Sequence, residues 1–127
     1  MRKLFTLEEA NALLPELREI LADVRRAVEE LARVEPEVSA LRWKIRGNGH
    51  NVPEEPFARQ RAARDAVQRP LARIQSLGCE LKDPRMGLID FPSRRGGEVV
   101  YLCWKLDEAE VAYWHPTDVG FAGRRPL

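Results

Sequence analysis

The sequence predicts an α+β fold, in which a long kinked antiparallel helical hairpin is followed by a three-stranded antiparallel β-meander. Two observations predict it. Before residue 78 the apolar residues recur at steps of three and four, which is the spacing of one helix face, and after residue 79 they alternate with polar residues as in strands. The length of 127 residues fits a single domain. We assign 5–78 to the helical hairpin and 79–127 to the β-meander and tail.

The first helix should begin near Leu7, because Thr6 is followed three positions later by Glu9, the signature of a capping box. The apolar residues then keep one phase over about four heptads, as in a coiled coil or a long hairpin. These seam residues are Leu17, Ile20, Val24, Ala27, Leu31, Val34, Val38, Leu41 and Ile45. Pro15 precedes this pattern and is either a kink or the first residue of a new helix. Pro36 falls within the pattern without shifting its phase, so we expect a kink there rather than a stop.

A loop rich in glycine and asparagine follows, over 47–53 around His50. The second helix is expected over 54–77, with Gly78 as its C-terminal stop and a further kink at Pro70. Its arginines scatter around the polar arc, where acidic side chains of the first helix can pair with them.

The two helices differ in length. The seam from Leu17 to Ile45 would span ~43 Å, whereas the second helix from Phe57 to Leu77 would span only ~31 Å. Since one partner helix cannot cover the whole seam, the remainder must pack on the C-terminal part or on a second protomer. We expect a homodimer for this reason; the alternative is a monomer whose sheet covers the excess.

Short alternating segments bounded by turn residues predict the strands, over 87–92, 98–106 and 110–115. Gly96-Gly97 is a hairpin-turn signal between the first two. Pro92 cannot donate to a strand ladder, so it must lie at a strand end or edge. The central strand should present one apolar face, formed by Val100, Leu102, Trp104 and Leu106. The irregular tail over 116–127 is expected to contain no further element.

Charge and composition argue against several classes of protein. Lysine and arginine number 21 against 20 aspartate and glutamate, so no overall field attracts nucleic acid or an anionic membrane. No signal peptide or membrane span is apparent. Cys79 and Cys103 lack the paired spacing of a disulfide or zinc framework. We therefore expect a cytoplasmic protein with two reduced thiols and with neither a membrane nor a nucleic-acid partner.

One charged residue stands out in the expected sheet. Asp90 lies between apolar neighbours, so it is either exposed or paired with another side chain, for which Arg124, Arg125 and His115 are available. A buried pair with an arginine would tie the tail to the sheet, and arginines can also clamp an anion. The candidate ligand-binding residues are Asp90 and His115 as polar groups, Trp114 and Phe121 as walls, and Arg124 and Arg125 as clamps.

Metal binding and covalent catalysis have weaker signals. Zinc sites usually show short paired spacings such as CxxC or HxxxH, and none is present. We predict no metal and no cofactor, with His115 and Asp118 as weak metal candidates. Catalysis by Cys103 would require His115 on the same face, which depends on the strand register. Cys103 is otherwise interpreted as a small buried apolar residue.

Several runs together resemble a known family. They are FTLEEAN (5–11), LLP (13–15), GLIDFP (87–92), LCW (102–104), WH (114–115) and GFAGR (120–124). The chain resembles, over essentially its whole length, an uncharacterised prokaryotic family, the domain of unknown function 2203. The resemblance implies a bacterial cytosolic protein. It implies no activity, cofactor or partner, and it assigns no functional residue.

Two hypotheses for the function follow. The leading one is a non-enzymatic interaction or scaffold protein that self-associates, or binds a protein partner, through its helical hairpin. The alternative is a small anionic-ligand- or metal-binding protein, conceivably an enzyme, with a site at the sheet edge around Asp90, His115 and Arg124. They differ in whether these groups converge on an open pocket or close into a satisfied internal network.

Overall fold

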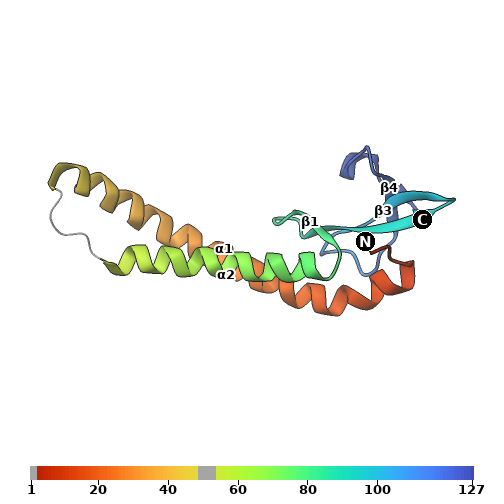
Figure 1. Cartoon of the computed structure of the whole chain (residues 1–127), viewed down its shortest axis with the longest axis horizontal. Helices are drawn as coiled ribbons and strands as arrows, with labels where there is room; N and C mark the ends of the chain where they lie inside the picture. The colour runs from red at the N-terminus through yellow and green to blue at the C-terminus, as the bar shows by residue number, and fades with distance from the viewer. Residues whose placement is uncertain (1–2, 49–53) are drawn as a thin grey trace.

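The computed structural model describes residues 3–48 and 54–127 (Figure 1). Two long helices, α1 (Leu7–Asn48) and α2 (Glu54–Ser76), lie antiparallel, and a sheet packs beside one end of the pair. The other end, residues 27–48 and 54–66, projects away from the sheet as an arm. The predicted α+β class is confirmed. Of the loop expected over 47–53, residues 47 and 48 belong to α1 instead, and the rest lies outside the described residues. Among the described residues, no helix combines the length and apolar composition needed to cross a bilayer.

The sheet contains five antiparallel strands, and each pairs with its neighbour in the chain. They are β1 (Glu80–Asp83), β2 (Leu88–Arg95), β3 (Glu98–Trp104), β4 (Tyr113–Pro116) and β5 (Arg125–Pro126). The predicted count of three is therefore wrong, as is the expectation that the tail holds no element, because a 3-10 turn, η1 (Phe121–Gly123), precedes β5. The two additional strands have only four and two residues, too few for an alternating pattern to be recognised.

The predicted helix signals are confirmed. At the start of α1 the Glu9 backbone N–H donates to the Thr6 hydroxyl at 3.1 Å, and the Thr6 N–H donates to the Glu9 carboxylate at 2.9 Å. These bonds to Thr6 lower the pKa of the Glu9 carboxyl. After α2, Gly78 adopts a φ of +95°, which ends the helix. Each helix continues through its prolines, and α1 follows a curved path (Figure 1).

The apolar seam of α1 is covered within the chain. Its first half belongs to a core shared with the sheet, in which Leu17, Ile20 and Trp104 are completely buried. Farther along, where α2 lies alongside α1, Val34 and Val38 are 2% and 0% exposed. The sheet and the end of α2 thus cover the first half of the seam together, and α2 covers the second half, where Leu31, Leu41 and Ile45 are half-buried. The mismatch in helix length consequently no longer argues for a second protomer.

Ion pairs join the polar faces of the two helices, as their opposite charges predict. They are Arg59–Glu37, Arg64–Glu35 at 3.5 Å and Arg73–Glu16 at 2.8 Å. All six side chains are partly exposed, so each pair contributes little to stability, of the order of 0–1 kcal/mol. Three arginines of α2, namely Arg59, Arg64 and Arg73, are thus accounted for by the hairpin itself.

Pro92 lies within β2, which continues to Arg95. The register between β1 and β2 ends at Asp90, so on that side Pro92 borders the N-terminal segment instead of β1, while on the other side it pairs with Tyr101 of β3. Its carbonyl accepts the Phe5 N–H at 2.7 Å. The predicted edge position is therefore correct, although the strand does not end there, and the missing N–H breaks no ladder bond.

Candidate functional site

Asp90 lies on the face of the sheet that points away from the helices. Its neighbours Ile89 and Phe91 are completely buried in the helix-side core, so alternation along β2 directs Asp90 to the opposite, outer face. It pairs in register with Glu80 of β1 and Cys103 of β3. Asp90 is only 3% exposed. A carboxylate buried to this extent requires polar partners.

The partner of Asp90 is His115 of β4, not an arginine. The His115 Nε2 atom lies 3.1 Å from both carboxylate oxygens of Asp90. Its Nδ1 atom lies 2.9 Å from the carbonyl oxygen of Pro116. Because a carbonyl oxygen can only accept, Nδ1 carries a hydrogen, and a second proton is then shared between Nε2 and the Asp90 carboxylate.

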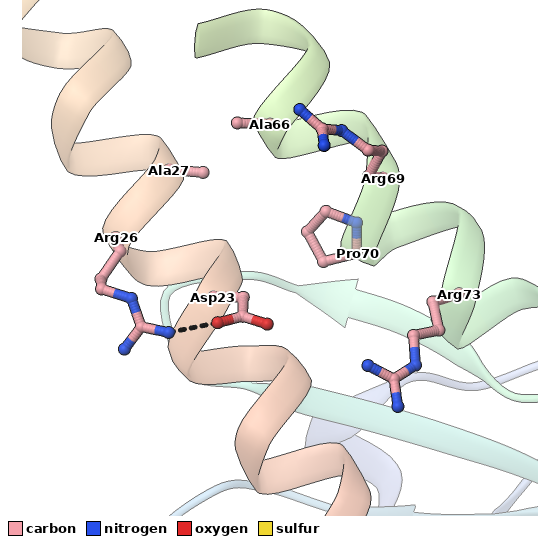
Figure 2. A pocket seen from close by; sticks show the side chains of 7 residues that line it. All are labelled: Asp23, Arg26, Ala27, Ala66, Arg69, Pro70 and Arg73. Carbon is pink, nitrogen blue, oxygen red and sulfur yellow. Dashed lines mark hydrogen bonds and ion pairs between the residues drawn. The ribbon is translucent and has the colours of Figure 1, made fainter.

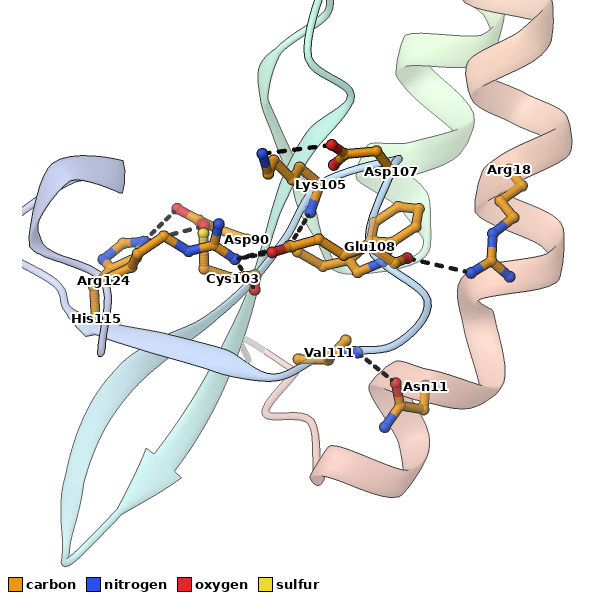
Figure 3. A network of polar contacts seen from close by, with 11 residues as sticks. Asn11, Arg18, Asp90, Cys103, Lys105, Asp107, Glu108, Val111, His115 and Arg124 are labelled. Atoms are coloured by element: carbon orange, nitrogen blue, oxygen red, sulfur yellow. Dashed lines mark hydrogen bonds and ion pairs between the residues drawn. The ribbon is translucent and has the colours of Figure 1, made fainter. Parts of the chain in front are cut away.

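Cys103 of β3 lies beside this pair (Figure 3). In the register, Tyr101 is opposite His115, and Cys103 is opposite both Asp90 and Tyr113, so all of these residues share the outer face. The Sγ atom of Cys103, a carboxylate oxygen of Asp90 and a ring nitrogen of His115 lie within 4.8 Å of one another. We call Asp90, Cys103 and His115 the outer-face cluster; its members come from three adjacent strands and are at most 3% exposed.

The thiol of Cys103 is in the wrong state for nucleophilic catalysis. Burial, followed by the charge of the nearby Asp90 carboxylate, raises its pKa to about 12. It is therefore protonated at neutral pH, whereas the thiolate is the reactive form. Cys103 and His115 do share a face, but this arrangement gives no support to a Cys–His catalytic pair.

Arg124 pairs with Glu108, a residue that the sequence did not single out. One guanidinium nitrogen donates to both Glu108 carboxylate oxygens, at 2.8 and 3.0 Å, and to the backbone carbonyl of Cys103 at 3.3 Å. The side chains of Arg124 and Glu108 are 12% and 17% exposed. Arg124 thus ties the tail to the sheet, next to the outer-face cluster (Figure 3).

The other predicted residues lie apart from the cluster. Trp114 is adjacent to His115 in β4 and so faces the opposite side, where the Arg125 and Arg95 guanidinium carbons lie 5.2 and 4.5 Å from its ring centre. Phe121 is 37% exposed, with Arg124 over its ring at 4.8 Å. Asp118 is exposed and is not part of the cluster that could hold a metal.

The predicted polar groups therefore close into a buried network. Asp90 is bonded to His115, and Arg124 is occupied by Glu108. Sequence reasoning found Asp90 because a charge in an apolar strand is conspicuous. It weighed Cys103 as a ligand type but interpreted it as a core residue, because a cysteine among apolar residues looks like core. It missed Glu108 because a loop residue carries no periodic signal.

The arm offers a different kind of surface. Trp43 is 75% exposed and Val28 is 44% exposed, both on α1. Closer to the sheet a groove of about 470 Å³ lies between the helices (Figure 2). Its lining combines small apolar residues with charged ones, namely Ala27, Ala66, Pro70, Asp23, Arg26, Arg69 and Arg73. The Arg26–Asp23 pair on its rim makes this groove polar as well as apolar.

Comparison with known proteins gives one match. A family model described as "Uncharacterized conserved protein (DUF2203)" matches residues 3–127. No curated protein and no solved structure matches the chain. The runs that suggested this family include those containing Asp90, Cys103, His115 and Arg124, which the fold brings together.

Proposed function

The chain belongs to the DUF2203 family of uncharacterised conserved proteins, and we propose that it is a non-enzymatic interaction protein that binds through its helical arm. The closed network on the outer face favours this function over that of an anion receptor, because Arg124 is occupied by Glu108. The observation that carries the proposal is the 75% exposure of Trp43 on the arm.

Trp43 does not contribute to the packing between the helices. It lies midway between the seam residues Leu41 and Ile45, about 200° around the helix from each, so its ring points away from α2. A large exposed aromatic side chain gains much from burial, and tryptophan is enriched among the residues that dominate binding energy at interfaces. The arm therefore carries an anchor residue that the chain itself leaves exposed.

We propose a second copy of the chain as the partner, which makes the protein a homodimer. Val28 and Trp43 are separated by fifteen positions, just over four helical turns, so they lie about 60° apart around α1, on neighbouring parts of its surface. In a two-fold dimer each copy presents the same face, so both residues can be buried twice. The arm would then act as a coiled coil shared between protomers. A cytoplasmic location is part of the proposal, since both cysteines are free.

Sedimentation equilibrium of the untagged chain tests this function. We expect a dimer that dissociates on dilution, and a Trp43→Ser variant whose dissociation constant is at least about 30-fold higher, as the loss of about 2 kcal/mol at an anchor residue implies. Val99→Ser is the matched control, because Val99 is exposed by 39% but lies on the sheet, far from the arm. It should dimerise like the unaltered protein.

A chain that stays monomeric at several hundred micromolar would overturn the self-association. Equal weakening by the Trp43 and Val99 substitutions would instead exclude the arm as the site of contact. Circular dichroism checks that each variant retains the helix content of the parent. We expect no loss, because the side chains of Trp43 and Val99 are both exposed.

A further inference from the structure

The outer-face cluster has the composition of a metal centre. We propose that Asp90, Cys103 and His115 bind one divalent transition-metal ion of the zinc type. The three residues offer a carboxylate, a thiol and an imidazole, and their ligand atoms lie within 4.8 Å of one another. Thiolate, imidazole and carboxylate together are the ligands that Zn²⁺ accepts in proteins.

The distances suit a shared ion. Two atoms bound to one tetrahedral Zn²⁺ at about 2.0–2.1 Å lie about 3.3 Å apart. The His115 Nε2 atom is 3.1 Å from each oxygen of Asp90, close to that separation. Because the two oxygens are equally near, Asp90 can supply both, which gives four donor atoms from three residues.

The orientation of His115 is already fixed by a contact outside the cluster. Its Nδ1 atom donates to the carbonyl oxygen of Pro116 at 2.9 Å. Metal-binding histidines usually hold the second ring nitrogen by such a bond, which fixes the tautomer and leaves the other nitrogen free for the ion.

The charge balance of the cluster permits one divalent ion to replace two protons. Without an ion, one proton is shared by His115 and Asp90, and a second is on the Cys103 thiol, whose pKa is raised mainly by burial. Binding forms the metal–nitrogen, metal–sulfur and metal–oxygen bonds and releases these two protons to solvent. Two positive charges leave and two arrive, so the buried region keeps its net charge.

Ligand type and burial narrow both the ion and its role. Mg²⁺ and Ca²⁺ prefer sites made only of oxygen ligands, so a sulfur and a nitrogen donor disfavour them. All three residues are at most 3% exposed, which resembles a closed structural site more than an open catalytic one. An ion here would join β2, β3 and β4 and thereby stabilise the sheet.

Cobalt provides the most direct test, because a thiolate bound to Co²⁺ gives a charge-transfer band in the near ultraviolet. The untagged chain, freed of metal with a chelator, is titrated with Co²⁺ and then with Zn²⁺. We expect the band to saturate at one equivalent and to disappear when Zn²⁺ displaces the cobalt. In Cys103→Ser the band should be absent. The affinity for Zn²⁺ should fall about 100-fold or more, which exceeds the loss expected when only a group that hydrogen-bonds to a ligand is altered.

Cys79→Ser is the matched control. Cys79 is equally buried and free, but it lies in the helix-side core, outside the cluster. This variant should retain the cobalt band and the Zn²⁺ affinity of the parent. A band that depends on Cys79 instead of Cys103 would assign the ion to another site.

The unaltered protein alone can overturn the proposal, whatever the folding of the variants. If it gives no thiolate band at millimolar Co²⁺ and binds no Zn²⁺ in competition with a weak chelator, Asp90 and His115 form a structural pair only. A His115→Gln variant that retains full affinity while folded, as judged by circular dichroism, would also exclude the site. Neither result would bear on self-association through the arm.

Discussion

The Arg124 guanidinium is fixed by hydrogen bonds at its edge and by an aromatic ring against its face. It donates to Glu108 and to the Cys103 carbonyl, and its carbon lies 3.9 Å from the ring centre of Tyr113. The Glu108 carboxylate has a second donor as well, since the Lys105 N–H donates to it at 2.9 Å. Arg124 therefore connects the tail to β3, β4 and the loop after β3. The Glu108 carboxylate supplies the negative charge that a largely buried guanidinium requires.

We predict that Glu108→Gln destabilises the fold by about 2–4 kcal/mol, because it leaves a largely buried guanidinium without its counter-charge. Urea denaturation measures the effect. The matched control is Glu54→Gln, which removes the partner of Arg61 in a pair whose side chains are 89% and 64% exposed. This control should cost less than about 0.5 kcal/mol. Equal effects of the two substitutions would show that the Arg124 pair is not special.

At this scale the sequence predicts the unusual residue but not its partner. Asp90 is conspicuous as a charge within an apolar strand, and His115 is one of three possible partners. The choice of His115 depends on the register of β3 with β4, in which Tyr101 lies opposite His115. Register is set by turns and by packing on the core, and neither is visible in the spacing of Asp90 and the candidates along the chain.

The connection between β1 and β2 shows how a single glycine allows two elements to approach. Gly87 adopts a φ of +64°, which other residues rarely adopt. A Cβ atom at this position would lie 2.7 Å from the Cβ of Leu106 and 3.3 Å from a methyl group of Leu21 in α1. The turn therefore packs against α1 and the loop after β3 at a distance that only glycine permits.

Alanine substitutions at two glycines can separate backbone strain from steric overlap. Gly97 also has a positive φ, of +82°, but a Cβ there would meet nothing within 4 Å. We expect Gly97→Ala to cost about 1 kcal/mol for its strained backbone alone. Gly87→Ala should cost about 1–3 kcal/mol more, because the added methyl overpacks the contact with Leu106. Thermal or urea unfolding of both variants gives the difference, and equal losses would contradict the close approach.

Elements with a long pattern can be predicted, and elements without one cannot. The seam of α1 repeats over many turns, so it predicts a helix that continues through Pro36, whereas at Pro15, before the seam begins, the sequence allows either a kink or a new helix. Strands β1 and β5 are short and polar, and they form because β2 and β4 offer free edges beside them. Their existence is a consequence of tertiary structure that no local pattern records.

The molecule as a whole is organised along α1, whose surroundings change from one end to the other. Near its start α1 packs on the sheet and on the end of α2, with Leu17, Phe91 and Ile74 in one core, and farther along it packs on α2. The sequence correctly indicates that α2 is too short to cover α1, but it cannot decide between the sheet and a second copy. That choice depends on how the sheet is oriented, which in turn depends on long-range contacts such as the bond from Phe5 to Pro92.

Burial of the Cys79 thiol makes the stability of the whole molecule fall as the pH becomes alkaline. Cys79 lies in the core between α1, α2 and the sheet, and burial raises the pKa of its thiol from 9.0 to about 11. The unfolded chain therefore loses this proton first, and between these two pH values the folded state holds more protons than the unfolded state. Stability that is fully present below pH 9 is consequently lost as the pH rises toward 11.

Each pKa unit by which the folded-state value exceeds the unfolded-state value corresponds to about 1.4 kcal/mol. We therefore predict that ionisation of Cys79 lowers the free energy of unfolding by up to about 3 kcal/mol between pH 9 and pH 11. The check is urea denaturation of the parent and of Cys79→Ser at pH 8 and at pH 10.5. Lysines and tyrosines titrate in both proteins, so only the difference between them reports the thiol. We expect the parent to lose more stability than the variant, because serine does not ionise there. Identical losses would mean that Cys79 becomes accessible to water before the fold opens, and that the core between α1, α2 and the sheet is looser than its contacts imply.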